Sequence, residues 1–282
     1  MIFTKVKTEK GLVLDFTNSN EYCLYDIDGL NPVAATINTT EFATSDGAMF
    51  NSARIGTRNI VLYVKIYPKI ELNRLNLYSY FKVKSNVTLY FRHDSLNVYI
   101  GGKVESFELD HFSNSQVAQI SILCTDPYFK AADSQKIEFS NVISLFEFPF
   151  SIAAEGVEFS RLEKVTTKII NAGEMGSGVT IQLFATTNQI VNPVIYNLTN
   201  NTYFGLNVAM NQGDLITITT HFNNKKVTLT RDGVDTNLLH AVQNGSTWLQ
   251  LESGENEISF SCDEGENDLT VSLEHTALFE GI

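Results

Sequence analysis

Apolar and polar residues alternate along most of this chain. Val, Ile, Thr, Tyr and Phe recur at every second position in short segments, and turn residues separate these segments. A period of two places neighbouring side chains on opposite faces of a strand, so that one face can be buried while the other meets water. The pattern predicts an all-β protein in which most segments are half-buried strands.

The clearest hairpin is predicted over residues 215–229. Four alternate residues of LITITTHF share one face: Ile216, Ile218, Thr220 and Phe222. Asn223 and Asn224 favour a turn, because asparagine tolerates the left-handed backbone that tight turns require. Val227 and Leu229 on the returning segment are expected to rejoin the same core.

A second hairpin is predicted between residues 257 and 274. Its apolar side chains alternate on both sides of the acidic segment DEGEN: Ile258, Phe260, Cys262, Leu269, Val271 and Leu273. The alternation is typical of two paired strands joined by a turn. The acidic turn is expected to face water.

One short helix is predicted in IELNRLNLYSYFKV. Four apolar residues recur there at every third position: Leu72, Leu75, Tyr78 and Phe81. This spacing is compatible with one face of a helix, and Glu71 lies where the positive end of the helix dipole favours an anion. The other elements are predicted to be strands and loops.

Length and composition favour two folded domains. The chain has 282 residues, whereas an ordinary domain has roughly 100 to 200. With 43% hydrophobic and 18% charged residues, it is too apolar for a disordered protein. Pro127 is expected to end a strand, and the charge balance changes just beyond it. We therefore predict an N-terminal domain over residues 1–135 and a C-terminal domain over residues 136–282.

The negative charge lies mainly in the second predicted domain. Residues 1–135 hold 13 Lys and Arg against 14 Asp and Glu, while residues 136–282 hold 7 against 18. Nucleic acids and anionic membranes attract proteins through clustered Lys and Arg, and this chain has no such cluster. We expect no nucleic-acid binding and no membrane binding.

The first residues and the cysteines indicate a soluble protein without a metal ion. Charged residues interrupt MIFTKVKTEKGLVLDF where a signal peptide needs an unbroken apolar stretch, and no later run approaches membrane-spanning length. Cys23, Cys124 and Cys262 are far apart, without a second ligand at metal-binding spacing. We expect three reduced thiols and no cofactor.

Two segments of the N-terminal half combine glycine, arginine, proline and aromatic residues in a recognisable order. In DGAMFNSARIGTRNIVLYVKI, Gly47 precedes a segment that contains Gly56, Arg58 and an apolar strand. A later segment closes on a run of four matching residues: Asp126, Pro127, Tyr128 and Phe129. Both segments resemble the distal tail protein family of siphophages, or prophages, of Gram-positive bacteria.

The C-terminal half is similar to the second domain of the same family. The similar segments are NPVIYNLTNNTYFGLNVAMNQGDLITITTHFNNKKVTL, GSTWLQLESGENEISF and the closing LFEGI. Turn geometry explains several of the matched positions, because Gly213 and Asp214 suit one turn before a strand while Gly254 and Asn256 suit another. These positions indicate the fold and carry no chemistry by themselves.

The resemblance implies both an architecture and a place in the virion. It implies a split-β-barrel-like N-terminal domain that forms a homo-hexameric ring, and a galectin-like C-terminal β-sandwich. It further implies a structural component of the tail tip or baseplate, made in the host bacterial cytoplasm. The implied partners are the major tail tube protein, the tape measure protein, the tail-associated lysin or tail-tip protein, and receptor-binding or baseplate proteins.

Arg58 has two interpretations at this point. It is able to form an ion pair between subunits of the ring, because a guanidinium binds a carboxylate through two parallel hydrogen bonds. An ion pair within the barrel is equally compatible with the sequence. An Arg58→Ala protein that keeps its oligomeric state would exclude the first interpretation.

No catalytic or metal-binding residue is predicted. The five histidines lie in strand-like or loop context without the motif of a nucleophile elbow: His93, His111, His221, His240 and His275. The acidic residues between 252 and 268 are typical of a solvated surface, and DEGENDLTVSLE lacks the spacing of a calcium-binding loop. We predict that the protein is not an enzyme.

A carbohydrate-binding module is the alternative function. In a galectin-like sandwich, Trp248 and Tyr203 would stack on a pyranose ring of a host cell-wall saccharide while nearby amides bind its hydroxyls. This hypothesis rests on analogy between folds. Core packing is the favoured interpretation of Trp248, which alternates with Gln250 and flanks Leu249 in a predicted strand.

Overall fold

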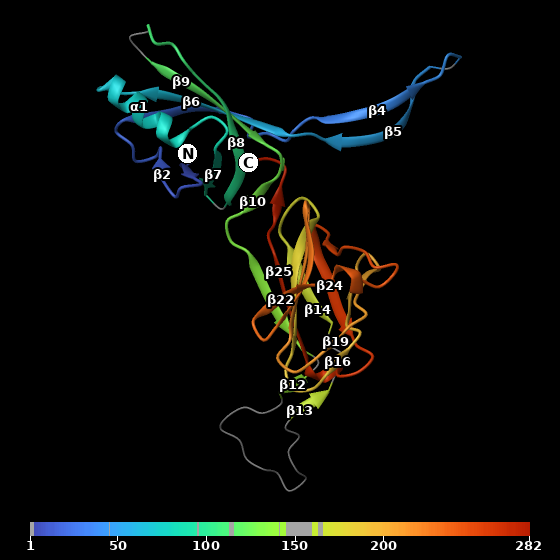
Figure 1. Ribbon diagram of the computed structural model, residues 1–282. Coiled ribbons are helices and arrows are strands. Elements are labelled where there is room, and N and C mark those ends of the chain that lie inside the picture. The colour runs from blue at the N-terminus through green and yellow to red at the C-terminus, as the bar shows by residue number, and fades with distance from the viewer. Residues whose placement is uncertain are drawn as a thin grey trace. The chain divides into compact units, whose positions relative to one another are not determined.

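A computed structural model gives the fold of this chain (Figure 1). It describes residues 3–44, 46–94, 96–112, 116–140, 142–144, 160–162 and 166–282. Two compact units are present: Met1–Asp133 together with Leu278–Ile282, and Ser134–Ala277. The last five residues, which the sequence analysis assigns to the second domain, lie in the first unit because β26 (Leu278–Phe279) pairs with β10 (Phe129–Ala131).

The first unit contains a nine-stranded sheet, a separate two-stranded sheet and the helix α1 (Ile70–Tyr80). Besides β10 and β26, its strands are β1 (Phe3–Thr8), β2 (Val13–Asp15), β3 (Tyr22–Asp28), β4 (Ala35–Glu41), β5 (Ala48–Ile55), β6 (Arg58–Ile66), β7 (Asn86–His93), β8 (Leu96–Leu109) and β9 (Val117–Cys124). The main sheet has the order β2-β1-β7-β8-β9-β6-β3, and β10 joins it through β8. Strands β4 and β5 pair with each other to form the separate sheet.

Strand β8 turns a corner of the nine-stranded sheet. Its first half pairs with β7 and its second half with β9, with a register shift between Val104 and Ser106. Gly102 lies at this corner, where a β-carbon would come within 2.7 Å of Ile122 and 2.8 Å of the Cys124 sulfur. A side chain here would collide with the core, so glycine permits the close approach of the two strands.

The predicted helix is confirmed, but only part of the predicted apolar pattern faces the core. The side chains of Asn73 and Leu77 face inward, and Phe81 follows one turn later with 1% exposure. These positions are four residues apart, which keeps them on one face of a helix with 3.6 residues per turn. Leu72 and Leu75 point outward, with exposed fractions of 58% and 56%.

The second unit is a sandwich of two antiparallel sheets. Its strands are β11 (Gln135–Phe139), β12 (Val142–Ser144), β13 (Ser160–Leu162), β14 (Thr167–Asn171), β15 (Ser177–Ala185), β16 (Ile190–Val191), β17 (Val194–Asn197), β18 (Thr202–Gly205), β19 (Ala209–Met210), β20 (Leu215–His221), β21 (Asn224–Arg231), β22 (Val234–Asn237), β23 (Gln250–Leu251), β24 (Gly254–Ser261) and β25 (Leu269–His275). Two short 3₁₀ helices are η1 (Leu239–Ala241) and η2 (Glu266–Asp268). One sheet has the order β11-β25-β15-β20-β21-β22 and the other β14-β24-β17-β18.

One of the two predicted hairpins is confirmed and the other is wrong. Strands β20 and β21 pair as predicted, with Ile216 and Ile218 fully buried, but Phe222 lies in the turn and is 77% exposed. Strands β24 and β25 alternate as predicted, yet they belong to opposite sheets. Alternation alone does not distinguish a hairpin from two strands that cross between sheets, because both bury one face.

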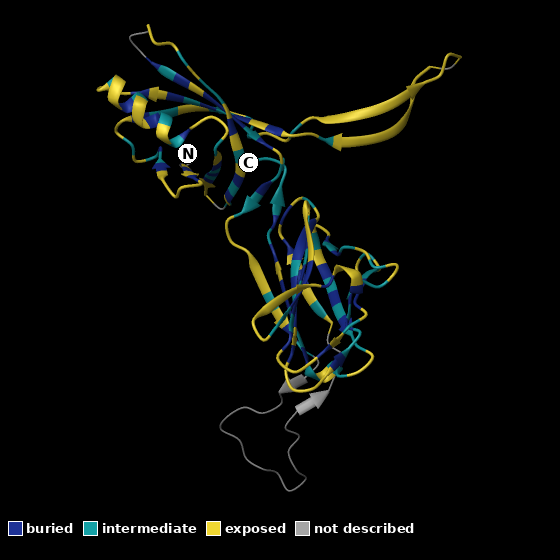
Figure 2. Cartoon of the chain, in the orientation of Figure 1, coloured by how far each residue is buried: buried dark blue, intermediate teal, exposed yellow. Residues whose placement is uncertain are grey.

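Each unit has its own hydrophobic core (Figure 2). The buried side chains of the first unit come from the nine-stranded sheet and the inner face of α1, while those of the second lie between its two sheets. The mainly β fold with one α-helix confirms the predicted fold class for the residues that the structure describes. No helix in this part of the chain is both long and apolar enough to cross a membrane.

Candidate functional site

Arg58 lies at the centre of a buried polar cluster in the first unit. It begins β6 and is only 2% exposed. Its guanidinium donates to the main-chain carbonyls of Gly29 (2.5 Å), Asn31 (2.7 Å) and Pro127 (2.6 Å), and also to that of Glu280. Burial lowers the pKa of Arg58, but a guanidinium titrates so far above neutral pH that it remains a cation.

The matched residues 126–129 support this guanidinium from one side. Phe129 is fully buried, and its ring centroid lies 4.5 Å from the central carbon of the Arg58 guanidinium, at cation–π distance. Asp126 accepts the main-chain N–H of Tyr128 at 3.3 Å and pairs with Lys130 at 2.9 Å, which fixes the turn. The turn thereby aims the carbonyl of Pro127 at Arg58.

Two further segments converge on Arg58, and the sequence analysis did not identify either as its partner. Gly29 has a φ of +90°, and a β-carbon there would lie 2.1 Å from the carbonyl oxygen of Asn59 in β6. Only glycine fits this position. From the C-terminal segment, the N–H of Ile282 donates to the carbonyl of Leu30 at 3.1 Å. Carbonyl acceptors have no residue-type signature, so only the turn residues around Gly29 could have indicated this contact.

The Arg58 cluster, which we define as Arg58 with the residues that it contacts, bears on the two interpretations of this arginine. Buried donors require partners, and here four carbonyls and one aromatic ring of the same unit supply them. These contacts favour the interpretation in which Arg58 acts within its own unit, with main-chain carbonyls as acceptors in place of a carboxylate. The ion pair between subunits stays a hypothesis that the Arg58→Ala protein tests.

The arm, which we define as β4 and β5 with the turn between them, leaves from this cluster and returns to it. Gly29 and Asn31 precede β4, and Arg58 follows β5. Every residue of β4 is exposed, as are seven of the eight in β5. Figure 2 shows this hairpin as an almost continuous exposed segment that extends away from the nine-stranded sheet. The matched Gly47 lies in its turn, with a φ of +90°, and Gly56 lies where β5 passes into β6.

The arm has one apolar and one polar face. Directly paired residues share a face of a hairpin. The more apolar face contains the pairs Ala35–Ile55, Ile37–Ala53, Thr39–Phe50 and Glu41–Ala48, with Glu41 next to the turn. The other face contains Thr36–Arg54, Asn38–Ser52 and Thr40–Met49. Ile37 and Phe50 are 62% and 64% exposed. This face therefore carries apolar side chains of the kind that are usually buried, and no other element among the described residues covers them.

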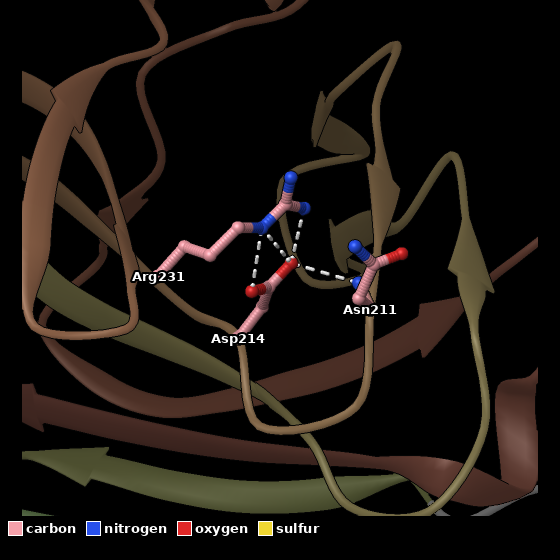
Figure 3. A network of polar contacts seen from close by, with 3 residues as sticks. All are labelled: Asn211, Asp214 and Arg231. Carbon is pink, nitrogen blue, oxygen red and sulfur yellow. Dashed lines mark hydrogen bonds and ion pairs between the residues drawn. The ribbon is translucent and has the colours of Figure 1, made fainter.

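In the second unit, Asp214 anchors the start of β20 (Figure 3). Its carboxylate is almost fully buried and accepts a bifurcated hydrogen bond from Arg231 Nε, at 2.9 Å to Oδ1 and 3.1 Å to Oδ2, and a hydrogen bond from Nη2 at 2.5 Å. It also accepts the main-chain N–H of Asn211 at 2.7 Å. The hydrogen bonds from Arg231 lower the pKa of Asp214 and keep it ionised. Gly213, with a φ of +83°, completes the turn.

Asn256 holds the turn before β24. It is fully buried, donates to the carbonyl of Glu252 at 2.8 Å and accepts the N–H of the same residue at 2.9 Å. Gly254 lies inside this turn with a φ of +91°. The matched positions of the second unit thus act on backbone geometry, as the sequence analysis predicts for turns.

Trp248 and Tyr203 contact different partners. Trp248 is half-buried against the core, with its ring 5.0 Å from that of Phe204, and Lys225 lies 5.6 Å above the ring. Tyr203 is the neighbour of Phe204 in β18, so it points to the opposite face of the strand, where it packs beside Tyr196. This placement does not bring the two rings together as one stacking surface. The sugar-binding role stays a prediction.

The described residues show no arrangement that favours metal binding or catalysis. No group of three or more His, Cys, Asp or Glu among them could hold a metal ion. Thr180 and His221 form one hydroxyl–imidazole contact at 3.2 Å, on the solvent side of a sheet. His275 is buried, and burial lowers its pKa.

Comparison with known proteins identifies both units. The phage tail protein RIFT-related domain matches residues 9–124, and the siphovirus-type tail component, C-terminal domain, matches residues 172–277. The crystal structure of the SPP1 Dit (gp 19.1) protein, a hub adsorption apparatus in phages that infect Gram-positive bacteria, superposes with a TM-score of 0.72 at 10% identity, over 98% of this chain and 99% of that chain. A chain of the phage P2 baseplate in its activated conformation with Ca gives 0.50 at 12% identity, over 98% of both chains. A search of the curated proteins finds no match.

Proposed function

Because the chain belongs to the siphovirus distal tail protein family, we propose that it assembles with itself into a six-membered ring at the tip of the tail. Membership in this family makes it a structural tail hub or baseplate component. The ring, its copy number and its neighbours are our proposal. In this proposal the protein performs no catalysis, and its work is to join other tail components.

The apolar face of the arm is the observation that carries this proposal. A two-stranded hairpin is marginally stable by itself, and exposed apolar surface costs free energy in water. Ile37 and Phe50 nevertheless remain more than 60% exposed in a single chain. Burial against a second copy would remove this surface from water. A ring follows when each copy uses one surface to bind the next and a different surface to receive the previous copy.

The remaining tail components would bind around this ring. We propose that the ring joins the major tail tube protein to the tape measure protein and the tail-associated lysin on its axis. Receptor-binding or baseplate proteins would dock around it during host adsorption. The support for these partners is family membership, together with a first unit whose nearly balanced charge is compatible with tight packing between copies.

Light scattering across a range of concentrations tests the ring. The expected species has six times the monomer mass of 31.5 kDa. Negative-stain images of that species should show six-fold symmetry and a central hole. A protein that remains monomeric at every concentration, alone and with the tail tube protein, would overturn the proposal.

A further inference from the structure

Helix α1 exposes leucines and buries an asparagine. Asn73 faces inward and donates to the carbonyl of Pro68 at 3.0 Å, so a polar side chain anchors the helix. Leu72 and Leu75 point outward, and both are more than half exposed. A surface helix normally places its apolar residues against the core. The two leucines are three residues apart and therefore adjacent on the helix surface, where they form a small apolar ridge.

Basic residues lie at both ends of this helix, and the arm is acidic at its end. Lys69, Lys82 and Lys84 flank α1 and are exposed, and the exposed Glu71 is the acidic residue beside the ridge. The turn end of the arm carries Glu41 and Asp46 and has no Lys or Arg between residues 39 and 50. Opposite charges of this kind steer two surfaces together and fix their orientation.

The arm and α1 also lie in places that suit two neighbours in a ring. Figure 1 shows α1 at the far side of the first unit from the arm, so the arm of a copy does not reach the helix of the same copy. In a ring with head-to-tail contacts, each copy presents two different and complementary surfaces. The arm supplies an apolar face with an acidic end, and α1 supplies an apolar ridge with lysines beyond both helix ends.

We propose that the outward face of α1 receives the apolar face of the arm from the adjacent copy. This inference rests on the proposed ring and specifies the contact that closes it. Ile37 and Phe50 of one copy pack on Leu72 and Leu75 of the next. The acidic end of the arm lies beside the lysines that flank the helix.

Glutamine substitution of the ridge is the first test. Glutamine favours helix nearly as well as leucine, so Leu72→Gln with Leu75→Gln should preserve the fold. We expect the concentration for half-maximal ring assembly to rise at least tenfold. Val234→Thr with Leu239→Gln is the matched control, because these residues of the second unit are 65% and 49% exposed. The control should assemble like the unsubstituted protein.

Cross-linking between two separately prepared proteins is the second test. One protein carries Ala53→Cys on the apolar face of the arm, and the other carries Ser79→Cys on the outward face of α1. Both carry serine in place of the half-buried Cys23 and Cys262. A short bis-maleimide should link the mixed proteins into covalent dimers, whereas Thr36→Cys on the polar face of the arm should link far less.

The outcomes separate the contact from the ring. Loss of assembly in the glutamine variant together with the Ala53–Ser79 link would support the contact. Rings that form with the glutamine substitutions, and that yield no link, would overturn the contact and leave the ring intact. An unsubstituted protein that never assembles would overturn the ring, and the inference with it.

Discussion

The Arg58 cluster and the arm depart from the usual distribution of polar and apolar residues in opposite directions. Arg58 places a cation inside the first unit at 2% exposure, whereas the arm places Ile37 and Phe50 outside it at 62% and 64%. The two features adjoin in the chain, because β4 begins a few residues after Gly29 and β5 ends shortly before Arg58.

The two features differ in whether the chain itself satisfies their interactions. The buried cation has a carbonyl partner in each of the segments that surround it, so it needs nothing from outside the unit. The apolar face of the arm has the pattern of a core surface but contacts water. A satisfied buried polar group indicates structure, while an uncovered apolar face indicates an interface. Stability and assembly should therefore respond to different substitutions.

Arg58→Ala should produce the largest loss of stability. The substitution leaves four carbonyls without their donor and opens a cavity above Phe129, which together should cost about 4 kcal/mol in the free energy of unfolding of the first unit. Calorimetry of the full chain would measure this as a lower transition temperature for one of two units. Arg54→Ala removes the same side chain from an exposed position in the arm and should leave that transition unchanged. Equal stability of both variants would show that the cluster is not structural.

Trp248→Ala tests whether the second unit uses its tryptophan for packing or for sugar. Removing a half-buried ring that packs on Phe204 should destabilise the second unit by about 3 kcal/mol. Trp248→Phe should restore most of this loss. We expect no difference between these proteins on a glycan array. Saccharide binding by the unsubstituted protein that disappears in folded Trp248→Phe would instead favour the carbohydrate-binding alternative.

Asp214→Asn should have a smaller, pH-dependent effect. Arg231 lowers the pKa of Asp214 in the folded chain, so the unfolded chain binds the proton more readily. Stabilisation by this carboxylate is complete above its ordinary pKa of 3.8 and disappears as the pH falls through the lower, folded value. Urea unfolding at pH 7 should show a loss of about 2 kcal/mol for the substituted protein. The difference from the unsubstituted protein should shrink below pH 3.8, and a constant difference across this range would contradict the pairing.

The alternation in the sequence predicts strands with one buried face, but it does not predict which strands pair or which residues contact each buried face. Strands β20 and β21 were correctly paired, because a short turn leaves the chain few other partners. Strands β24 and β25 show equally clear alternation, yet they pair in opposite sheets, and this choice depends on segments far away in the chain. The sequence marks Arg58 as a position that matches the family, but its carbonyl partners have no sequence signature.

Helix α1 shows why the spacing of apolar residues does not by itself identify the buried face. Leu72 and Leu75 are spaced as on one face of a helix, and in a monomeric protein we would expect that face to lie against the core. In the structure Asn73 takes the inward position and Leu72 faces outward. In the contact that we propose, a second copy covers this face, so the outward leucines would serve assembly and not folding.

Substitutions in the arm should have the smallest effect on stability. Ile37→Thr with Phe50→Thr places a β-branched residue, which favours strands, at both positions while it removes most of their exposed apolar area. Because these side chains have little contact within the chain, the free energy of unfolding of the monomer should change by less than about 0.5 kcal/mol. Ring assembly should nevertheless be lost, as judged by light scattering at the concentration where the unsubstituted protein assembles. Thr36→Ala on the polar face should affect neither property. A stability loss above about 1 kcal/mol for the double variant would show that the arm has a core of its own, and the contrast with the Arg58 cluster would fail.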